Sequence, residues 1–163
     1  MRHLLLLLFI FLAAAGTHAA EPPQRPFLVI DAGMHTGVIR RVDVSADGKL
    51  LASASEDKTL QLWSIPESRL LKTFRLPMSD GEGGRAYAVA LSPDGRILAA
   101  GGLDADAEIN GNGGYVYLFD TISGRITGRL GPLPEATSDL DFSADGQRLA
   151  VGLAGTGGVA LWQ

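Results

Sequence analysis

The chain lacks cysteine altogether and has only three histidines among its 163 residues. His3 and His18 lie in the N-terminal segment, so His35 is the single histidine of the rest of the chain. Without cysteine there is no disulfide and no thiol nucleophile, and one histidine is too few for a zinc site of His and Cys ligands. A Ser-His-Asp triad could use His35 alone. We therefore expect no catalytic residue, no metal and no cofactor, and predict that the chain is not an enzyme.

Basic residues are also few, and they do not cluster. The 14 Lys and Arg residues stand against 18 Asp and Glu residues, which gives a net charge of −4. No basic stretch alternates with aromatic residues, as a surface that follows nucleic-acid phosphates would. The glycine-rich stretches 81–84 and 111–114 do not open a helix, as a phosphate-binding loop does. The sequence therefore predicts no nucleic-acid partner.

Long apolar stretches are absent except near the N-terminus. A short positive start at residues 1–3 precedes an apolar run over residues 4–15, which is too short to span a bilayer because that takes about 20 residues. Thr17 and Ala19 then offer the small residues at positions −3 and −1 of a signal-peptidase site. We predict a signal peptide at residues 1–20, a Pro-rich linker at 21–26, no stable membrane insertion after cleavage, and a periplasmic or secreted protein. The alternative is an uncleaved anchor.

One pattern, Ser-x-Asp-Gly, occurs three times, at residues 45–48, 92–95 and 143–146. Each copy lies between two short runs in which apolar residues alternate. Because Asp-Gly tolerates the positive φ of a tight turn, each copy predicts a β-hairpin. The Asp residues of the three copies are 47 and 51 residues apart, a spacing typical of a stacked repeat.

Each repeat continues with further β-type runs. A third run ends in Leu-Trp or Leu-Phe in every copy, and the first two copies add a fourth run at residues 69–74 and 125–130. Four antiparallel strands at this period form one blade of a β-propeller. We therefore predict an all-β fold with three blades, at about residues 35–74, 75–130 and 131–163, of which the last lacks its fourth strand. Three blades are too few to close a ring.

Because the ring is not closed, we expect either a fragment of a longer chain or a ring completed by another chain, and favour the fragment. Open blades would otherwise leave unpaired edges and apolar faces in water.

The first repeat resembles the WD-repeat propeller family over several elements. It has His35, the Ser-x-Asp-Gly turn, the run 51–55, the run 57–59 and Leu62-Trp63 in order. The resemblance covers about residues 27–163. It implies a hydrogen-bonded relay from a His through a Ser or Thr and an Asp to a Trp indole. The positions that match this relay are His35, Ser53 or Ser55, Asp57 and Trp63.

The later repeats depart from this pattern, because neither has a His before its first strand. After their Asp-Gly turns, Ala100-Gly101 and Val151-Gly152 also replace the hydroxyl residues of the first repeat. The resemblance therefore implies a complete relay in the first repeat alone.

The resemblance also implies a surface for partners. In such propellers the residue five positions after the His faces the mouth of the central channel, which here is Arg40. Tyr87 and Ser138 hold the same position relative to Asp-Gly, and Arg85 and Glu56 are expected near the same rim. Tyr and Arg are enriched in interface hot spots. We predict a non-enzymatic scaffold that binds a protein or peptide at this rim; the alternative is an ordinary solvated rim.

Residues 34–41 and 85–95 resemble the repeat region of exported bacterial WD40 proteins. Some of those proteins also carry a caspase-like peptidase domain. This resemblance implies a second hypothesis, a sensor or regulatory repeat region of an enzyme whose catalytic domain lies outside this chain.

An acidic insertion at residues 103–114 raises the question of calcium binding. It carries oxygen ligands at alternate positions, namely Asp104, Asp106, Glu108, Asn110 and Asn112. A calcium loop of the EF-hand type needs Gly at its sixth position and Glu at its twelfth, and this loop has Ile109 and Tyr115 there. We therefore expect a solvated loop and no metal.

Overall fold

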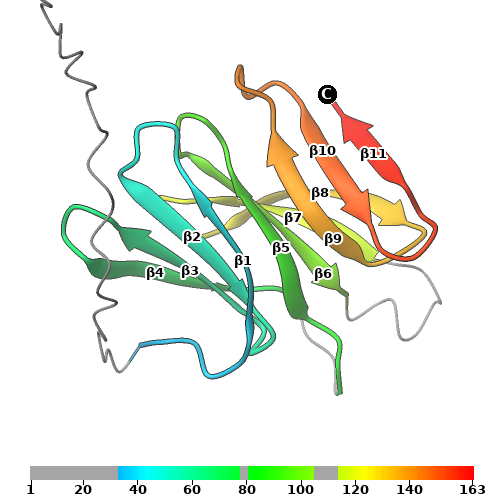
Figure 1. The fold of residues 1–163 in the computed structure, drawn as a ribbon, viewed down its shortest axis with the longest axis horizontal. Coiled ribbons are helices and arrows are strands. Elements are labelled where there is room, and N and C mark those ends of the chain that lie inside the picture. The colour runs from blue at the N-terminus through cyan, green and yellow to red at the C-terminus, as the bar shows by residue number, and fades with distance from the viewer. Residues whose placement is uncertain (1–32, 78–80, 105–113) are drawn as a thin grey trace, which may run out of the picture. The chain divides into compact units, whose positions relative to one another are not determined.

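The computed structural model describes residues 33–77, 81–104 and 114–163 (Figure 1). Within these ranges the chain forms eleven strands. The predicted signal peptide, the linker and the start of the repeat region at 27–32 lie outside the described residues. No helix in the described part is long and apolar enough to cross a bilayer. The strands are β1 (Ile39–Val44), β2 (Leu50–Ser55), β3 (Thr59–Ser64), β4 (Arg69–Arg75), β5 (Arg85–Leu91), β6 (Ile97–Leu103), β7 (Gly114–Asp120), β8 (Ile126–Leu133), β9 (Thr137–Phe142), β10 (Leu149–Leu153) and β11 (Val159–Trp162).

The strands form three antiparallel sheets in chain order. The sheets are β1-β2-β3-β4, β5-β6-β7-β8 and β9-β10-β11, and we call them blade 1, blade 2 and blade 3. The prediction of an all-β fold with three blades is confirmed, including a last blade of three strands. The first strands of the blades, β1, β5 and β9, are neighbours, so they form the inner side of the array (Figure 1).

The three Ser-x-Asp-Gly turns have the same structure. In the first, the Gly48 N–H donates to the Ser45 carbonyl, and the Ser45 hydroxyl donates to Asp47 Oδ1 over 2.7 Å. The glycine has a positive φ of 69°, 69° and 71° in the three copies, which is why Gly is needed there. The serine hydroxyl and a backbone N–H also lower the pKa of the aspartate in each turn (Asp47, Asp94 and Asp145).

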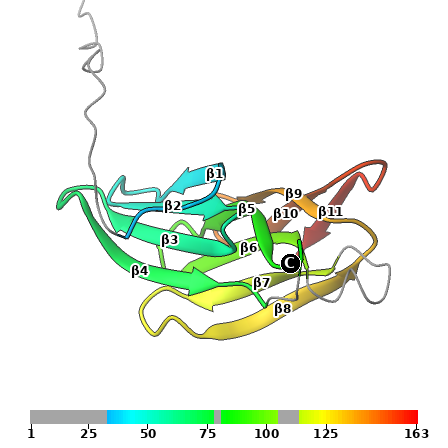
Figure 2. The same ribbon diagram turned by 90° about the horizontal axis from the view of Figure 1, so that it is seen from below.

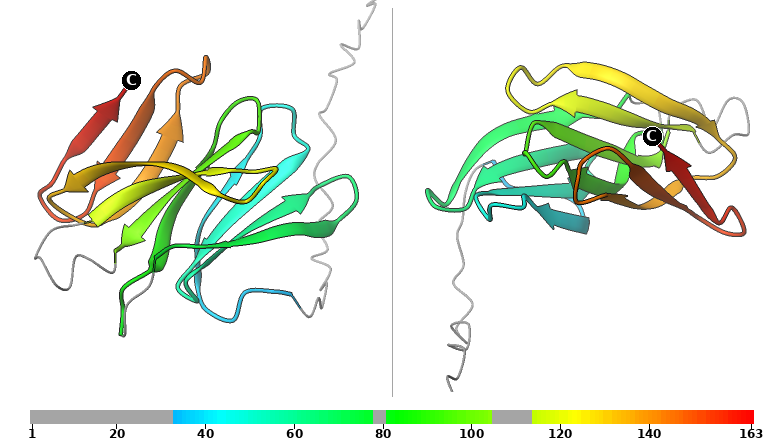
Figure 3. Two further views of the ribbon diagram at one scale, coloured as in Figure 1. Left: turned by 180° about the vertical axis from the view of Figure 1, so that it is seen from behind. Right: turned by 90° about the horizontal axis from the view of Figure 1, so that it is seen from above.

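Blade 2 lies between blade 1 and blade 3 (Figure 2, Figure 3). Its two faces therefore take part in two separate apolar cores. The core shared by blades 1 and 2 includes Leu60, Leu62, Phe74, Val89, Leu98 and Phe119, and the core shared by blades 2 and 3 includes Ala90, Val116, Leu133, Leu140, Leu149 and Val151. Phe74 and Phe119 meet edge to face, with ring centroids 5.3 Å apart.

Within the described part of the chain, blade 1 and blade 3 each keep one face uncovered. Val42 and Val89 hold the same register in β1 and β5, yet Val42 is 53% exposed and Val89 is 1% exposed. On blade 3, Val159 and Leu161 are exposed, whereas the matching residues of blade 1, Leu60 and Leu62, are buried. The three described sheets thus do not close a ring, which confirms the prediction of an open array.

Candidate functional site

A β-bulge interrupts the first strand of every blade near its start. Ile39 pairs with Ser55 and Arg41 with Ala54, so Arg40 is the extra residue of the bulge. The pairings of β5 with β6 leave out Tyr87 in the same way, and those of β9 with β10 leave out Ser138. An extra residue leaves the ladder and turns its side chain in a new direction. The three predicted rim residues therefore share one unusual backbone feature.

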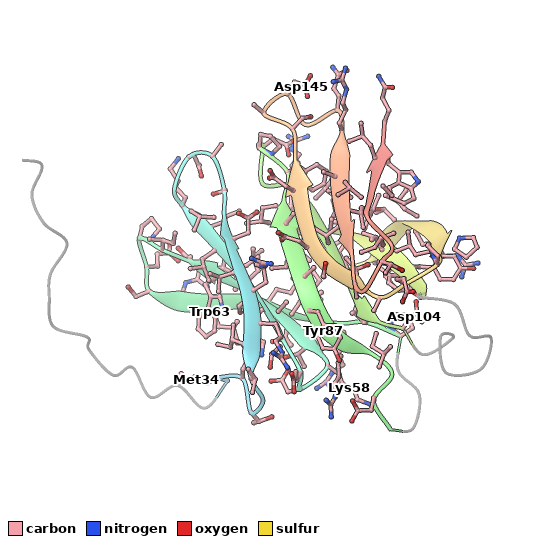
Figure 4. The ribbon with its side chains drawn as sticks, turned by 45° about the vertical axis from the view of Figure 1, so that its right-hand side comes forward. Met34, Lys58, Trp63, Tyr87, Asp104 and Asp145 are labelled. Atoms are coloured by element: carbon pink, nitrogen blue, oxygen red, sulfur yellow. The ribbon has the colours of Figure 1, made fainter. Side chains whose placement is uncertain are left out.

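The rim lies at the opposite end of the blades from the Ser-x-Asp-Gly turns. Tyr87 and Lys58 lie near one end of the sheets, and Asp145 lies at the other (Figure 4).

Charged side chains from blades 1 and 2 meet at this rim. Arg40 donates to Glu56 Oε1, and Arg85 Nη1 lies 3.6 Å from Glu56 Oε2. Arg85 also pairs with Glu82 over 2.9 Å. The guanidinium carbon of Arg40 lies 5.8 Å from the centre of the Tyr87 ring, within the range of a cation–π contact. These contacts join four of the five predicted rim residues, Arg40, Glu56, Arg85 and Tyr87. The fifth, Ser138, lines a cavity together with Arg40 and Tyr87.

A cavity of about 280 Å³ opens between the bulged strands. Its walls come from all three blades and are formed by Arg40, Arg41, Tyr87, Ala136, Thr137, Ser138 and Ala154. Arg41 spans from blade 1 to blade 3, because its Nη2 lies 3.2 Å from Asp139 Oδ1 and donates to the Ser138 carbonyl over 3.4 Å. Sequence reasoning missed Arg41 and Thr137, although each is the immediate neighbour of a predicted rim residue.

A second polar cluster stands in blade 1, around the His35 ring. The Trp63 indole N–H donates to Ser53 Oγ over 3.3 Å, and Ser53 Oγ lies 2.8 Å from His35 Nε2. His35 Nδ1 lies 2.9 Å from Asp57 Oδ2 and 3.0 Å from the Thr59 hydroxyl. Since the indole only donates and the carboxylate only accepts, these contacts are all satisfied when neutral His35 carries its proton on Nδ1. The cluster holds β2, β3 and the segment before β1 together.

Asp57 is the anchor of this cluster. Burial by itself would raise the pKa of its carboxyl, but hydrogen bonds from the Thr59 hydroxyl, the Thr36 N–H and the His35 ring outweigh burial and hold the pKa of Asp57 at about 2. Of the two candidate serines, Ser53 contacts the ring. Ser55 instead accepts a hydrogen bond from the Asp57 N–H over 3.2 Å and shapes the turn.

The repeat register, the blade geometry and this cluster agree with one known family. A sequence model described as "WD domain, G-beta repeat" matches residues 32–64 and 70–109. The chain carries WD40 repeats. The matched segments contain β1 to β3 of blade 1, most of β4, and β5 and β6 of blade 2.

Several curated proteins have similar sequences, and the name of one of them includes WD repeats. The chain is 31% identical to "WD repeat-containing protein SL1-17" of Schistosoma mansoni over 120 residues, which are 74% of this chain and 35% of that protein. It is 30% identical to "U3 small nucleolar RNA-associated protein 12" of Saccharomyces cerevisiae over 117 residues, 71% of this chain and 11% of that protein. It is 29% identical to "Eukaryotic translation initiation factor 3 subunit I" of Culex quinquefasciatus over 127 residues, which are 72% of this chain and 36% of that protein. The chain thus spans about a third or less of the length of these relatives.

In the second WD40 blade an aspartate takes an internal role. Asp104, which the sequence suggested as a member of a solvated acidic loop, is buried. Its Oδ2 accepts hydrogen bonds from the Tyr117 hydroxyl over 2.7 Å and from the Tyr115 N–H over 3.1 Å. Residues 105–113 of the predicted loop lie outside the described residues. Among the residues that are described, no group of three His, Asp or Glu side chains could hold a metal ion.

Proposed function

We propose that this WD40-repeat chain is a non-enzymatic scaffold that binds a protein or peptide at the rim around Arg40, Tyr87 and Ser138. The observation that carries the proposal is the bulge at the same position of all three blades. Bulges are frequent next to binding sites because they re-aim a side chain. WD40 propellers commonly serve as protein-interaction scaffolds, which supports the same conclusion.

The composition of the rim also supports partner binding. Tyr and Arg carry much of the binding energy in protein interfaces, and here both line a cavity that residues of all three blades surround. A side chain of a partner that enters this cavity would contact three blades at once.

A cross-linking experiment tests the rim directly. A photo-reactive amino acid is placed at Ser138 in one full-length protein and at Ile122, which is exposed on blade 2, in another. We expect a discrete adduct with one protein when the photo-reactive residue is at position 138, and no such adduct when it is at position 122. The Tyr87→Ala substitution should abolish the adduct at position 138. The adduct should form again when the partner is added in purified form. Equal adducts at both positions would show that the rim is an ordinary solvated surface.

We also propose that the protein is exported, with residues 1–20 as a cleaved signal peptide. The support is the sequence of that segment, which combines a positive start, a short apolar run and small residues at its end. N-terminal sequencing of the protein from its native source tests this. We expect the mature chain to begin at Ala20 or Glu21, and a chain that retains residues 1–20 would contradict export by cleavage.

The second hypothesis, a repeat region of a caspase-like peptidase, stays a prediction. Its catalytic Cys is absent from the 163 residues, so the activity would have to lie in further sequence. Reading the gene beyond the codon of Gln163 separates the two hypotheses. Further WD40 repeats alone favour the scaffold, and an α/β segment with a Cys-His pair favours the peptidase.

A further inference from the structure

At the rim beside the cavity, Arg40 is more exposed than the carboxylate with which it pairs. The Arg40 side chain is 53% exposed, whereas Glu56, which accepts hydrogen bonds from it, is 17% exposed. Glu56 also lies within 3.6 Å of Arg85, so one largely buried carboxylate faces two guanidinium groups. A molecule that approaches this part of the rim therefore meets Arg40 before it meets Glu56.

A second guanidinium group faces the same cavity from the next position in the chain. Arg40 and Arg41 both line the walls, and no Asp or Glu does. Arg41 pairs with Asp139 outside the lining, and that aspartate is itself more than half exposed. A planar guanidinium group presents its N–H donors in a fork that matches a carboxylate, so the walls favour an anionic group.

The remaining walls combine one aromatic ring, two alanines and the hydroxyl residues Thr137 and Ser138. Tyr87, Ala136 and Ala154 line the cavity beside the two arginines. The volume of about 280 Å³ lies just below the range of about 300–1,000 Å³ typical of pockets for drug-sized ligands. The cavity is therefore suited to a side chain rather than to a large cofactor.

We propose that this cavity binds an acidic side chain, Asp or Glu, of an extended segment of the partner. The proposal rests on the proposed function of the rim and adds the chemistry of what the rim binds. The carboxylate pairs with Arg40 and Arg41, and the aliphatic part of the side chain packs on Tyr87. Tyr87 also positions Arg40 through the cation–π contact.

A pair of synthetic peptides tests the charge requirement. A fluorescent peptide of alternating Glu and Ala is titrated with the full-length protein, beside a twin in which Gln replaces every Glu. We expect the Glu peptide to bind at least about tenfold more tightly than the twin, because charge-assisted hydrogen bonds are the stronger ones. Its affinity should fall as NaCl rises from about 50 to about 200 mM, since salt screens exposed charges.

Matched arginine variants locate the contact. Arg40→Ala and Arg41→Ala should each weaken binding of the Glu peptide about tenfold and leave the twin unchanged. Arg129→Ala is the control, because Arg129 also lies over a tyrosine ring, that of Tyr115 at 4.4 Å, but outside the rim cavity. Circular dichroism of each variant shows that it is folded. Equal loss in Arg129→Ala would overturn the assignment of the site.

The outcomes separate this proposal from the function on which it rests. If the Glu peptide and its twin bind equally and Ser138 still cross-links to a partner, the proposal of an acidic ligand is overturned. The proposed scaffold function then still stands. If no peptide binds and no cross-link forms, both are overturned. If a phosphoserine version of the peptide binds more than about tenfold more tightly than the Glu peptide, the cavity selects a phosphate group. The proposal that it binds a carboxylate is then overturned.

Discussion

The backbone N–H of Leu91 donates a hydrogen bond to Asp43 Oδ2 over 2.7 Å and so joins the first strand of blade 2 to the first strand of blade 1. Asp43 is only partly exposed, and Leu91 is buried in the shared core. A buried backbone donor that loses its acceptor is costly, because no solvent replaces the lost partner. This contact is one of those that hold blades 1 and 2 against each other.

Removing the Asp43 carboxylate should therefore destabilise the fold. We expect Asp43→Ala to lower the free energy of unfolding by about 1–3 kcal/mol, since the Leu91 N–H is left without this acceptor. Urea denaturation measures this change in the free energy of unfolding. Asp141 has the same register on the uncovered face of blade 3, so Asp141→Ala is the control and should change stability by less than about 0.5 kcal/mol. A similar loss in both variants would contradict the role of the inter-blade bond.

Two leucines at one register position test the difference between covered and uncovered faces. Leu62 in blade 1 is 3% exposed, and Leu161 in blade 3 is 66% exposed. Leu62→Ala should cost about 2–5 kcal/mol because it opens a cavity between blades 1 and 2. Leu161→Ala should cost less than about 0.5 kcal/mol. The measurement is again urea denaturation, and an equal cost at both positions would show that the face of blade 3 is covered.

The low pKa of Asp57 predicts that the free energy of unfolding falls at low pH. Its pKa is about 2 in the fold and about 3.9 in an unfolded chain, so the folded state binds the proton more weakly. The stabilisation is complete above about pH 5, one unit above the pKa of the unfolded chain, and is lost as the pH falls toward about 2. Asp57→Asn removes this contribution, so the stability difference between wild type and variant should shrink over that range. A difference that is constant from about pH 5 to about pH 2 would contradict it.

A substitution at Gly102 tests whether the bulge at Tyr87 shapes the rim. A Cβ at Gly102 would lie 2.0 Å from the Arg85 carbonyl oxygen and 2.8 Å from the Tyr87 nitrogen, both of which are backbone atoms. We expect Gly102→Ala to cost about 1–3 kcal/mol and to weaken partner binding, because Arg85 and Tyr87 must move. Gly128→Ala is the control, since its nearest contact is Leu118 Cδ1 at 3.7 Å. Unchanged binding in a folded Gly102→Ala protein would show that the bulge does not set the rim.

The turns and most strands could be predicted because their causes are local. Ser45, Asp47 and Gly48 close the first turn with their own hydrogen bonds, and the alternation of apolar residues marks the strands on both sides. The same holds for the fourth strands, which the sequence placed at 69–74 and 125–130 and which the structure shows as β4 and β8.

The rim could be predicted only in part. Arg40, Tyr87 and Ser138 were found through family register, but the bulges depend on which residues pair across two strands, and one sequence does not show that. Arg41 was missed because its contacts are to Ser138 and Asp139, almost a hundred residues away in the chain.

By itself the sequence determined the class of the protein, because three Ser-x-Asp-Gly turns at a blade-like spacing specify hairpins through short-range hydrogen bonds and a positive φ. Only the tertiary structure decided how equivalent residues differ. Val42 and Val89 are the same residue in the same register, and burial separates them because a neighbouring blade covers one and not the other. Asp104 likewise turned inward to Tyr117, since a buried hydroxyl needs an acceptor that only packing can bring near.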